Sequence, residues 1–274
     1  MPVQLSAVLA AAASRLAPHS DTSRLDVELL MAHALGVERE ALLFSASGQE
    51  PPAGFEALVR RREAGEPIAY IIGRRGFWTI ELEVGPGVLV PRPDSETLIE
   101  AALSHFGKAG PRRILDLGTG PGTLLLAALD QWPGATGLGI DYSPKALDYA
   151  RRNGDRLGLA ERASFRQGDW GAGIEEAFDL VLCNPPYVES GAELPRDVAD
   201  WEPHEALFAA ADGLCEYRRL APQIRRLLAP GGIACLELGA GQRDAVAGLF
   251  EAEGFTLKSL RDLNDIERCL VLSR

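Results

Sequence analysis

The chain is poor in the residues that bind metals or form disulfide frameworks. Its 274 residues include four cysteines and four histidines, all dispersed, with no CxxC pair and no HExxH spacing. The cysteines, Cys183, Cys215, Cys235 and Cys269, lie mostly in apolar stretches. We therefore expect buried free thiols in a reducing compartment, and we expect no metal site.

Positive net charge and long apolar runs are also lacking. Lysine and arginine number 28 against 39 aspartates and glutamates, which gives a net charge of -11. Proteins that bind duplex nucleic acid usually carry a basic face, so this composition argues against that class. The start of the chain lacks the basic segment of a secretory signal, and no apolar run reaches the roughly 18 residues of a membrane span. We expect a cytoplasmic protein.

The apolar residues that are present suffice for one large domain and a small one, because 46% of the chain is hydrophobic. Residues 1–75 predict a helical domain, starting with apolar residues at helical spacing between positions 5 and 16. A capping-box-like start at Ser23 and Asp26 predicts a second helix that ends at Gly36. A further helix should close at Gly65.

The pattern changes at residues 76–96, where we expect a β-hairpin. Apolar and polar residues alternate from Trp78 to Val84, and "GPG" then predicts a turn into a strand at Val88–Val90. From residue 111 onward, strand-like and helix-like segments alternate, which predicts an α/β fold with a mostly parallel sheet and helices on both faces. The expected domains are 1–75, 76–96 as a linker, and 97–274. Ligands should lie beyond the carboxyl ends of the strands.

A glycine-rich loop, "ILDLGTGPG", follows the first strand of this alternating region. Glycines between a strand and a helix let the backbone approach a ligand, which its amides can then bind. A dinucleotide fingerprint would place its third glycine at position 123, which is a threonine, so the pattern disfavours a nicotinamide cofactor. A tight turn without a ligand is the alternative. The loop residues are Gly118, Thr119, Gly120, Pro121 and Gly122.

Acidic residues and a tryptophan end the next two strands. Asp141 follows the glycine loop by about 20 residues, where a carboxylate can accept both hydroxyl hydrogens of a ribose. Its alternative role is to cap the helix after Ser143. In "QGDW", Asp169 could accept from an exocyclic amine and Trp170 could pack on a flat ring such as adenine. Ordinary core packing is the alternative for Trp170.

The fourth strand stops at Asn184, Pro185, Pro186 and Tyr187. The prolines cannot donate backbone hydrogen bonds, so they end the strand pairing and stiffen the chain. The Asn184 side chain and the Pro185 carbonyl offer acceptors, and Tyr187 offers a flat face. Together they suit a planar amino group whose nitrogen must point at an electrophile. A proline-rich turn with a capping asparagine is the alternative.

With these motifs the chain resembles the S-adenosylmethionine-dependent methyltransferases whose NPPY-type motif methylates planar nitrogens. The resemblance is closest to the peptide chain release factor glutamine methyltransferases, the PrmC/HemK family. It runs through nearly the whole chain, in "GEPIAYIIGRRGFW", "LVPRPDSETLIE", "ILDLGTGPG", "NPPYV", "WEPHEALFAAADGL" and "RDLNDIERCLVLSR". NPPY also occurs in adenine-DNA and ribosomal-RNA methyltransferases, so the other segments narrow the choice.

The resemblance implies a Rossmann-like sheet with an antiparallel C-terminal strand, and a helical N-terminal domain that recognises a release factor. Residues Gly118–Gly122 and Asp141 would hold S-adenosyl-L-methionine, which leaves as S-adenosyl-L-homocysteine, with Asp169 and Trp170 beside the adenine. Asn184–Tyr187 would hold the glutamine amide of the Gly-Gly-Gln loop, with Asn184 also next to the cofactor. We expect a monomer without direct nucleic-acid contacts. Pro121 departs from many members, removing an amide donor but suiting the first position of a helix.

Three rival functions remain open from the sequence. The first is an amino-group methyltransferase acting on adenine or guanine in DNA or RNA, with Tyr187 stacked on a flipped base. The second is a non-catalytic protein that binds a nucleoside and a partner. The third, an NAD-dependent oxidoreductase, is disfavoured by the glycine register. Arg92 and Glu96 have two open roles, which are to line the substrate mouth or to fasten the hairpin to the following helix.

Overall fold

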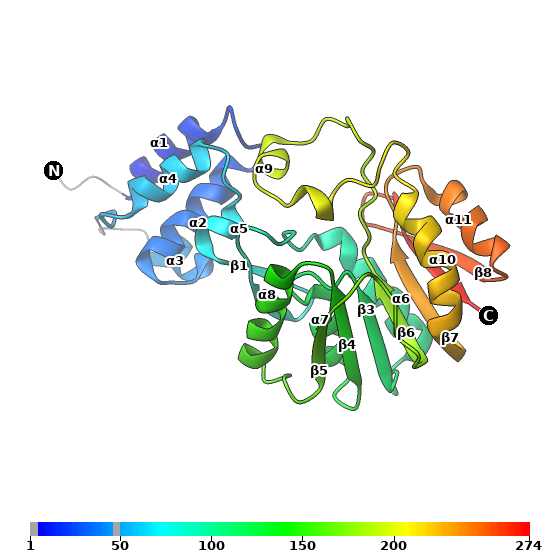
Figure 1. The fold of residues 1–274 in the computed structure, drawn as a ribbon. Coiled ribbons are helices and arrows are strands. Elements are labelled where there is room, and N and C mark those ends of the chain that lie inside the picture. Colours follow the sequence, from blue (N-terminus) through cyan, green and yellow to red (C-terminus); the bar gives the residue numbers. More distant parts are fainter. Residues whose placement is uncertain (1–4, 46–49) are drawn as a thin grey trace. The chain divides into compact units, whose positions relative to one another are not determined.

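The computed structural model describes residues 5–45 and 50–274. They fall into two compact units (Figure 1). Unit 1 runs up to Arg74 and also contains Leu194–Trp201, whereas unit 2 contains Arg75–Glu193 and Glu202–Arg274. The domain limits 1–75, 76–96 and 97–274 stay predictions, and they did not anticipate the return of residues 194–201 to unit 1.

Unit 1 is helical, and its apolar side chains form one core. Leu5, Leu9, Ala12 and Leu16 are buried along one face of the first helix, which confirms the predicted amphipathic helix. The same core takes up Val27, Leu30 and Val59 from later helices. The helices are α1 (Leu5–Leu16), α2 (Ser23–Leu35), α3 (Arg39–Ser45), α4 (Phe55–Glu63), α5 (Ile68–Ile72) and α9 (Arg196–Ala199).

The second helix ends as predicted but begins differently. Gly36 takes a left-handed φ of 67° directly after α2, which confirms the predicted end. At the start, Thr22 occupies the N-cap position and Ser23 is already helical, so the predicted capping box is wrong. The Asp26 carboxylate accepts from the Thr22 hydroxyl at 2.9 Å and from Arg62 Nε at 2.8 Å. These side-chain donors replace the backbone amide that a capping box would use.

The hairpin forms, but its turn lies earlier than predicted. Strands β1 (Arg74–Phe77) and β2 (Ile80–Glu83) pair as a two-stranded sheet. The two-residue turn consists of Trp78, at φ 53°, and Thr79. A left-handed first position matches the twist of paired strands, so this short turn closes the hairpin before "GPG" is reached.

The predicted strand at Val88–Val90 is wrong. The Val90 amide donates to Glu202 Oε2 at 2.9 Å instead of to a neighbouring strand. The sequence left open whether Glu96 lines the substrate mouth or fastens the hairpin to the following helix. The structure agrees with the second role, because Glu96 Oε1 accepts a hydrogen bond from the Trp78 backbone amide at 2.8 Å. This bond fastens the hairpin turn to the start of α6 (Glu96–Phe106).

Unit 2 is built on a seven-stranded sheet in the order β5-β4-β3-β6-β7-β9-β8. Neighbours from β5 to β7 are parallel, and β9 is antiparallel to both β7 and β8. This mostly parallel sheet with its antiparallel C-terminal strand confirms the predicted Rossmann-like fold. The strands are β3 (Arg113–Leu117), β4 (Thr136–Asp141), β5 (Ala163–Gln167), β6 (Phe178–Cys183), β7 (Leu228–Glu237), β8 (Thr256–Arg261) and β9 (Glu267–Ser273).

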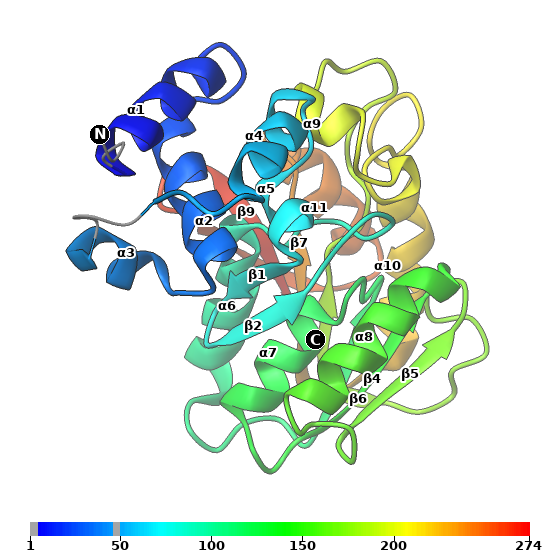
Figure 2. The same cartoon turned by 90° about the vertical axis from the view of Figure 1, so that its left-hand side faces the viewer.

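Helices cover both faces of the sheet, as predicted. Tyr217 and Leu220 from α10 (Cys215–Leu227) and Phe250 from α11 (Arg243–Ala252) pack with Leu117 and Val181 in one core on one face. In Figure 2, α7 (Thr123–Gln131) and α8 (Pro144–Arg156) stand in front of the strands and α11 behind them. The unit 2 helices are α6, α7, α8, α10 and α11, with short 3-10 turns η1 (Pro93–Ser95) and η2 (His204–Ala206). Across the described ranges, no helix combines the length and hydrophobicity needed to cross a membrane.

Candidate active site

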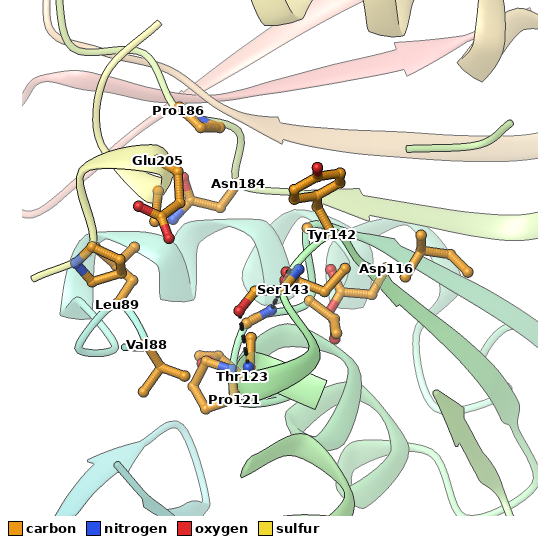
Figure 3. Close-up of a pocket in the computed structure, with 18 of the residues that line it drawn as sticks. Val88, Leu89, Asp116, Pro121, Thr123, Tyr142, Ser143, Asn184, Pro186 and Glu205 are labelled. Carbon is orange, nitrogen blue, oxygen red and sulfur yellow. Dashed lines mark hydrogen bonds between the residues drawn. The ribbon is translucent and has the colours of Figure 1, made fainter. Parts of the chain in front are cut away.

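A cavity of about 410 Å³ opens beyond the carboxyl ends of β3, β4, β5 and β6 (Figure 3). This is the edge at which open parallel sheets bind their ligands. In Figure 3, Asn184 and Glu205 lie across the cavity from Pro121 and Thr123. Of the predicted site residues, Gly122, Pro185 and Tyr187 do not line it. Those that do are Gly118, Thr119, Gly120, Pro121, Asp141, Asp169, Trp170, Asn184 and Pro186.

The glycine loop presents bare backbone to this cavity. Gly118 has φ 75°, and a Cβ on it would come within 3.0 Å of Trp170 Cζ3. Glycine is therefore required both for the turn and for the close packing of the indole. Gly122, at φ 89°, is the N-cap of α7, where a Cβ would meet Leu126 Cδ1 at 2.7 Å.

Pro121 is not the first residue of the helix, so that prediction is wrong. Helix α7 begins at Thr123, two residues later, because Gly122 must first turn the chain. The Pro121 carbonyl accepts from Nδ2 of the buried Asn153 at 2.9 Å. Asn153 also accepts from the Glu83 amide at 2.7 Å, so it ties the loop to the hairpin. No sequence signal marked Asn153, since an asparagine inside a helix has no distinctive pattern.

Asp141 is engaged by backbone amides at both carboxylate oxygens. Oδ2 accepts from the Gly120 amide and Oδ1 from the Ser143 amide, each at 2.8 Å. Ser143 itself caps α8 by accepting from the Ala146 amide at 3.3 Å, so helix capping does not fall to Asp141. Burial raises the pKa of Asp141, and the backbone bonds oppose this shift. Each oxygen keeps a further lone pair for a hydroxyl donor.

Trp170 and Asp169 are held by a helix far along the chain. Trp170 Nε1 donates to Glu216 Oε2 at 2.7 Å, and Arg219 donates to both oxygens of Asp169 at 2.6 and 2.7 Å. Arg219 also donates to Glu216 at 2.8 Å. The indole is thus fixed beside Gly118. Glu216 and Arg219 lie about one helix turn apart on α10 and carry no sequence signal that links them to residues 169 and 170.

Asp116 is a buried carboxylate in the wall of the cavity. Its Oδ2 accepts from the Thr119 hydroxyl at 2.6 Å and the Leu125 amide at 3.2 Å. Its Oδ1 has no hydrogen-bond partner in the described part of the chain. Burial raises the pKa of Asp116 to about 7. No separate role was predicted for it, although an aspartate inside the apolar run "ILDL" is a usable signal.

The two ends of the Asn-Pro-Pro-Tyr segment face different surroundings. Asn184 lines the cavity, and its Nδ2 donates to Ser95 Oγ at 3.3 Å. The Tyr187 hydroxyl donates to the buried Glu237 at 3.1 Å, and burial raises the pKa of Tyr187. The phenol is therefore anchored outside the cavity wall.

Arg92 lies at the cavity and is paired with a buried acid. It donates to Glu202 Oε1 at 2.5 Å, and Glu202 is 4% exposed. The sequence left two roles open for Arg92, which were to line the substrate mouth or to fasten the hairpin. Its place at the cavity agrees with the first of these roles. Within residues 5–45 and 50–274, no His, Cys, Asp and Glu side chains gather into a group of three that could hold a metal ion.

Comparison with known proteins matches both parts of the chain. The family model "PrmC N-terminal domain" matches residues 7–73, and the model "Methyltransferase domain" matches residues 111–260. A release factor glutamine methyltransferase of Rhodospirillum rubrum is 46% identical over 257 residues, which is 92% of this chain and 79% of the relative. This chain belongs to the release factor glutamine methyltransferases.

Other relatives of this methyltransferase agree. A release factor glutamine methyltransferase of Caulobacter vibrioides is 40% identical, over 92% of this chain and 89% of its own length. A crystal structure of a methyltransferase from Pyrococcus furiosus shares the fold, with a TM-score of 0.54 and 19% identity, over 79% of this chain and 96% of that one. The predicted family and enzyme class are confirmed.

The cavity fits S-adenosyl-L-methionine, which is the cofactor of this methyltransferase. Gly118 and Gly120 have no side chain, so a ligand can approach the backbone of the loop closely. The Asp141 carboxylate has free lone pairs that can accept hydrogen bonds from ribose hydroxyls. Asp116 is 0% exposed, so its carboxylate in the cavity wall would favour a cationic group through its charge rather than by direct contact. Which residues hold each part of the cofactor stays a prediction.

Cofactor binding should depend on the ionisation of Asp116. Because a cationic ligand favours the carboxylate, binding below pH 7 should release a proton, and affinity should rise with pH by at most about tenfold per unit until it levels near pH 7. Titration calorimetry with S-adenosyl-L-methionine, which carries the sulfonium charge, measures this. In Asp116→Asn the rise should be absent. An identical pH profile in both proteins would contradict the assignment to Asp116.

Proposed function

We propose that this protein transfers a methyl group from S-adenosyl-L-methionine to the side-chain amide nitrogen of the glutamine in the Gly-Gly-Gln loop of peptide chain release factors. The observation that carries the proposal is the placement of Asn184. Its amide nitrogen is bonded to Ser95, and its carbonyl oxygen accepts no hydrogen bond within the described ranges. It lies in the same cavity wall as the glycine loop.

The reaction needs orientation more than acid-base chemistry. An amide nitrogen is a poor nucleophile because its lone pair is delocalised into the carbonyl. Asn184 Oδ1, in the cavity wall, would accept one of its N–H hydrogens and stabilise the positive charge that develops on nitrogen, whereas the predicted second acceptor, the Pro185 carbonyl, belongs to a residue that does not line the cavity. When bound, the cofactor supplies the methyl group as an electrophile on its sulfonium. The new N–C bond forms as the C–S bond breaks, and the nitrogen loses its proton late, to water or a peptide carbonyl.

The size of the cavity supports a side chain as the group that enters. At about 410 Å³ it matches a small-molecule site, so a nucleoside cofactor would occupy most of it. Only a small part of the methyl acceptor, such as one side chain, could then enter beside the cofactor. A protein substrate must therefore present its glutamine from outside the cavity.

Recognition of the release factor is assigned to the helical domain, residues 1–75. Its support is the match of residues 7–73 to the PrmC N-terminal domain. We assign the chain to the cytoplasm, as a monomer that contacts no nucleic acid directly, in line with its net charge of -11. This places it in translation termination, where release factors act.

Methyl transfer from labelled S-adenosyl-L-methionine tests the proposal. The substrates are a purified bacterial release factor and a copy whose Gly-Gly-Gln glutamine is replaced. Label on the intact factor alone is the expected result. Absence of label on both, with cofactor binding still measurable, would contradict the proposal and make RNA or DNA amino groups the next substrates to test.

A further inference from the structure

Two polar side chains linked to Asn184 by hydrogen bonds are almost closed off from solvent. Ser95, the last residue of η1, lines the cavity but is only 3% exposed, and Glu237, the last residue of β7, is 1% exposed. Glu237 does not line the cavity. A buried carboxylate costs free energy unless hydrogen bonds compensate it. Its contacts therefore indicate what it does.

Glu237 receives a hydrogen bond at each carboxylate oxygen. The Ser95 hydroxyl donates to Oε2, and the Tyr187 hydroxyl donates to Oε1 at 3.1 Å. Burial raises the pKa of Glu237, whereas these bonds and the charge of Arg268 favour the ionised form. One carboxylate thus anchors both ends of the Asn-Pro-Pro-Tyr segment, Tyr187 directly and Asn184 through Ser95.

The chemistry of these groups gives the chain of bonds one direction. A carboxylate only accepts, and a serine hydroxyl has a single proton. Because Ser95 gives its proton to Glu237, it can only accept from Asn184. Nδ2 of Asn184 must then face Ser95, and Oδ1 must face away from it. A planar amino group presents N–H donors. Asn184 can accept a hydrogen bond from such a group only when its Oδ1 faces away from Ser95.

We propose that Ser95 and Glu237 are positioning residues that set which end of the Asn184 amide meets the substrate. The inference rests on the proposed function, since the direction of the amide matters only if the reacting group carries N–H donors. With the amide reversed, Nδ2 would oppose those donors, and no acceptor would remain on the side chain.

The test compares two hydroxyl deletions on the same stretch of chain. Ser95→Ala should lower kcat for release-factor methylation by roughly tenfold, the value of one hydrogen bond, while KM for the cofactor stays within about twofold. Thr97→Val is the matched control, because the 5% exposed Thr97 hydroxyl donates only to the Asp94 carbonyl at 2.7 Å. It should keep kcat within about twofold, and Ser95→Thr should restore activity.

A second variant and a second readout keep the inference separate from folding and from the substrate. Glu237→Gln retains the shape but can donate to Ser95, which lets the chain of bonds reverse, so kcat should fall severalfold. Side-chain amide NMR signals of Asn184, identified by their loss in Asn184→Ala, should shift in Ser95→Ala but not in Thr97→Val.

The outcomes are distinguishable. Wild-type kcat in Ser95→Ala, equal losses in Ser95→Ala and Thr97→Val, or unshifted Asn184 signals would each overturn the positioning role. If the wild-type protein methylates no release factor, the proposed function fails, and the NMR comparison still decides whether Ser95 orients the Asn184 amide.

Discussion

Asn184→Ala is expected to lower kcat for release-factor methylation at least about 100-fold while leaving cofactor affinity within about threefold. The substitution removes the carbonyl oxygen that would accept from the glutamine amide. It also leaves Ser95 Oγ without its donor, but it removes no hydrogen bond of the glycine loop or of Asp141. Single-turnover methylation with saturating cofactor measures the loss, and calorimetry with S-adenosyl-L-homocysteine measures the binding.

Asn264→Ala is the matched control for Asn184→Ala. Asn264 lies in the turn between β8 and β9, in the same unit, and does not line the cavity. It should transfer methyl at the wild-type rate. If Asn184→Ala also retains a rate within a fewfold of wild type, or if its whole defect is in cofactor affinity, Asn184 does not act on the methyl acceptor.

The sheet and its loops could be predicted because their signals are local. Apolar runs such as "ILDL" and "FDLVLC" identify buried parallel strands, and the carboxyl ends of such strands meet at one edge. The glycine loop and Asn184 follow a strand directly, Asp141 is the last residue of β4, and Trp170 lies three residues after the end of β5. Their gathering around one cavity therefore follows from strand order alone.

The supporting residues could not be predicted, because their partners are distant in the sequence. Glu216 lies 46 residues after Trp170, Glu237 lies 142 residues after Ser95, and Glu202 lies 112 residues after Val90. Each is an acid in an ordinary helix, strand or loop pattern. The misplaced hairpin turn has a related cause, since "GPG" is a strong turn signal but Val90 is drawn to Glu202 by a tertiary contact.

Asp141→Ala is expected to weaken binding of S-adenosyl-L-homocysteine by about 1.5–3 kcal/mol, or roughly 10- to 150-fold, because charge-assisted hydrogen bonds to ribose hydroxyls would be lost. Calorimetry measures the change. Asp148→Ala, an exposed aspartate on α8, is the control and should bind as wild type. Unchanged affinity in Asp141→Ala would remove the residue from the cofactor site.

Asp141→Ala could weaken ligand binding for two reasons, a lost contact to the ribose or a loosened glycine loop. A ligand analogue distinguishes between them. The carboxylate accepts from the Gly120 and Ser143 amides, so its removal could also loosen the glycine loop. A 2′-deoxy analogue of S-adenosyl-L-homocysteine lacks one ribose hydroxyl. If Asp141 binds that hydroxyl, the analogue should bind wild type more weakly than the parent ligand, and Asp141→Ala should bind both almost equally. If Asp141 acts only through the loop, the two losses should add.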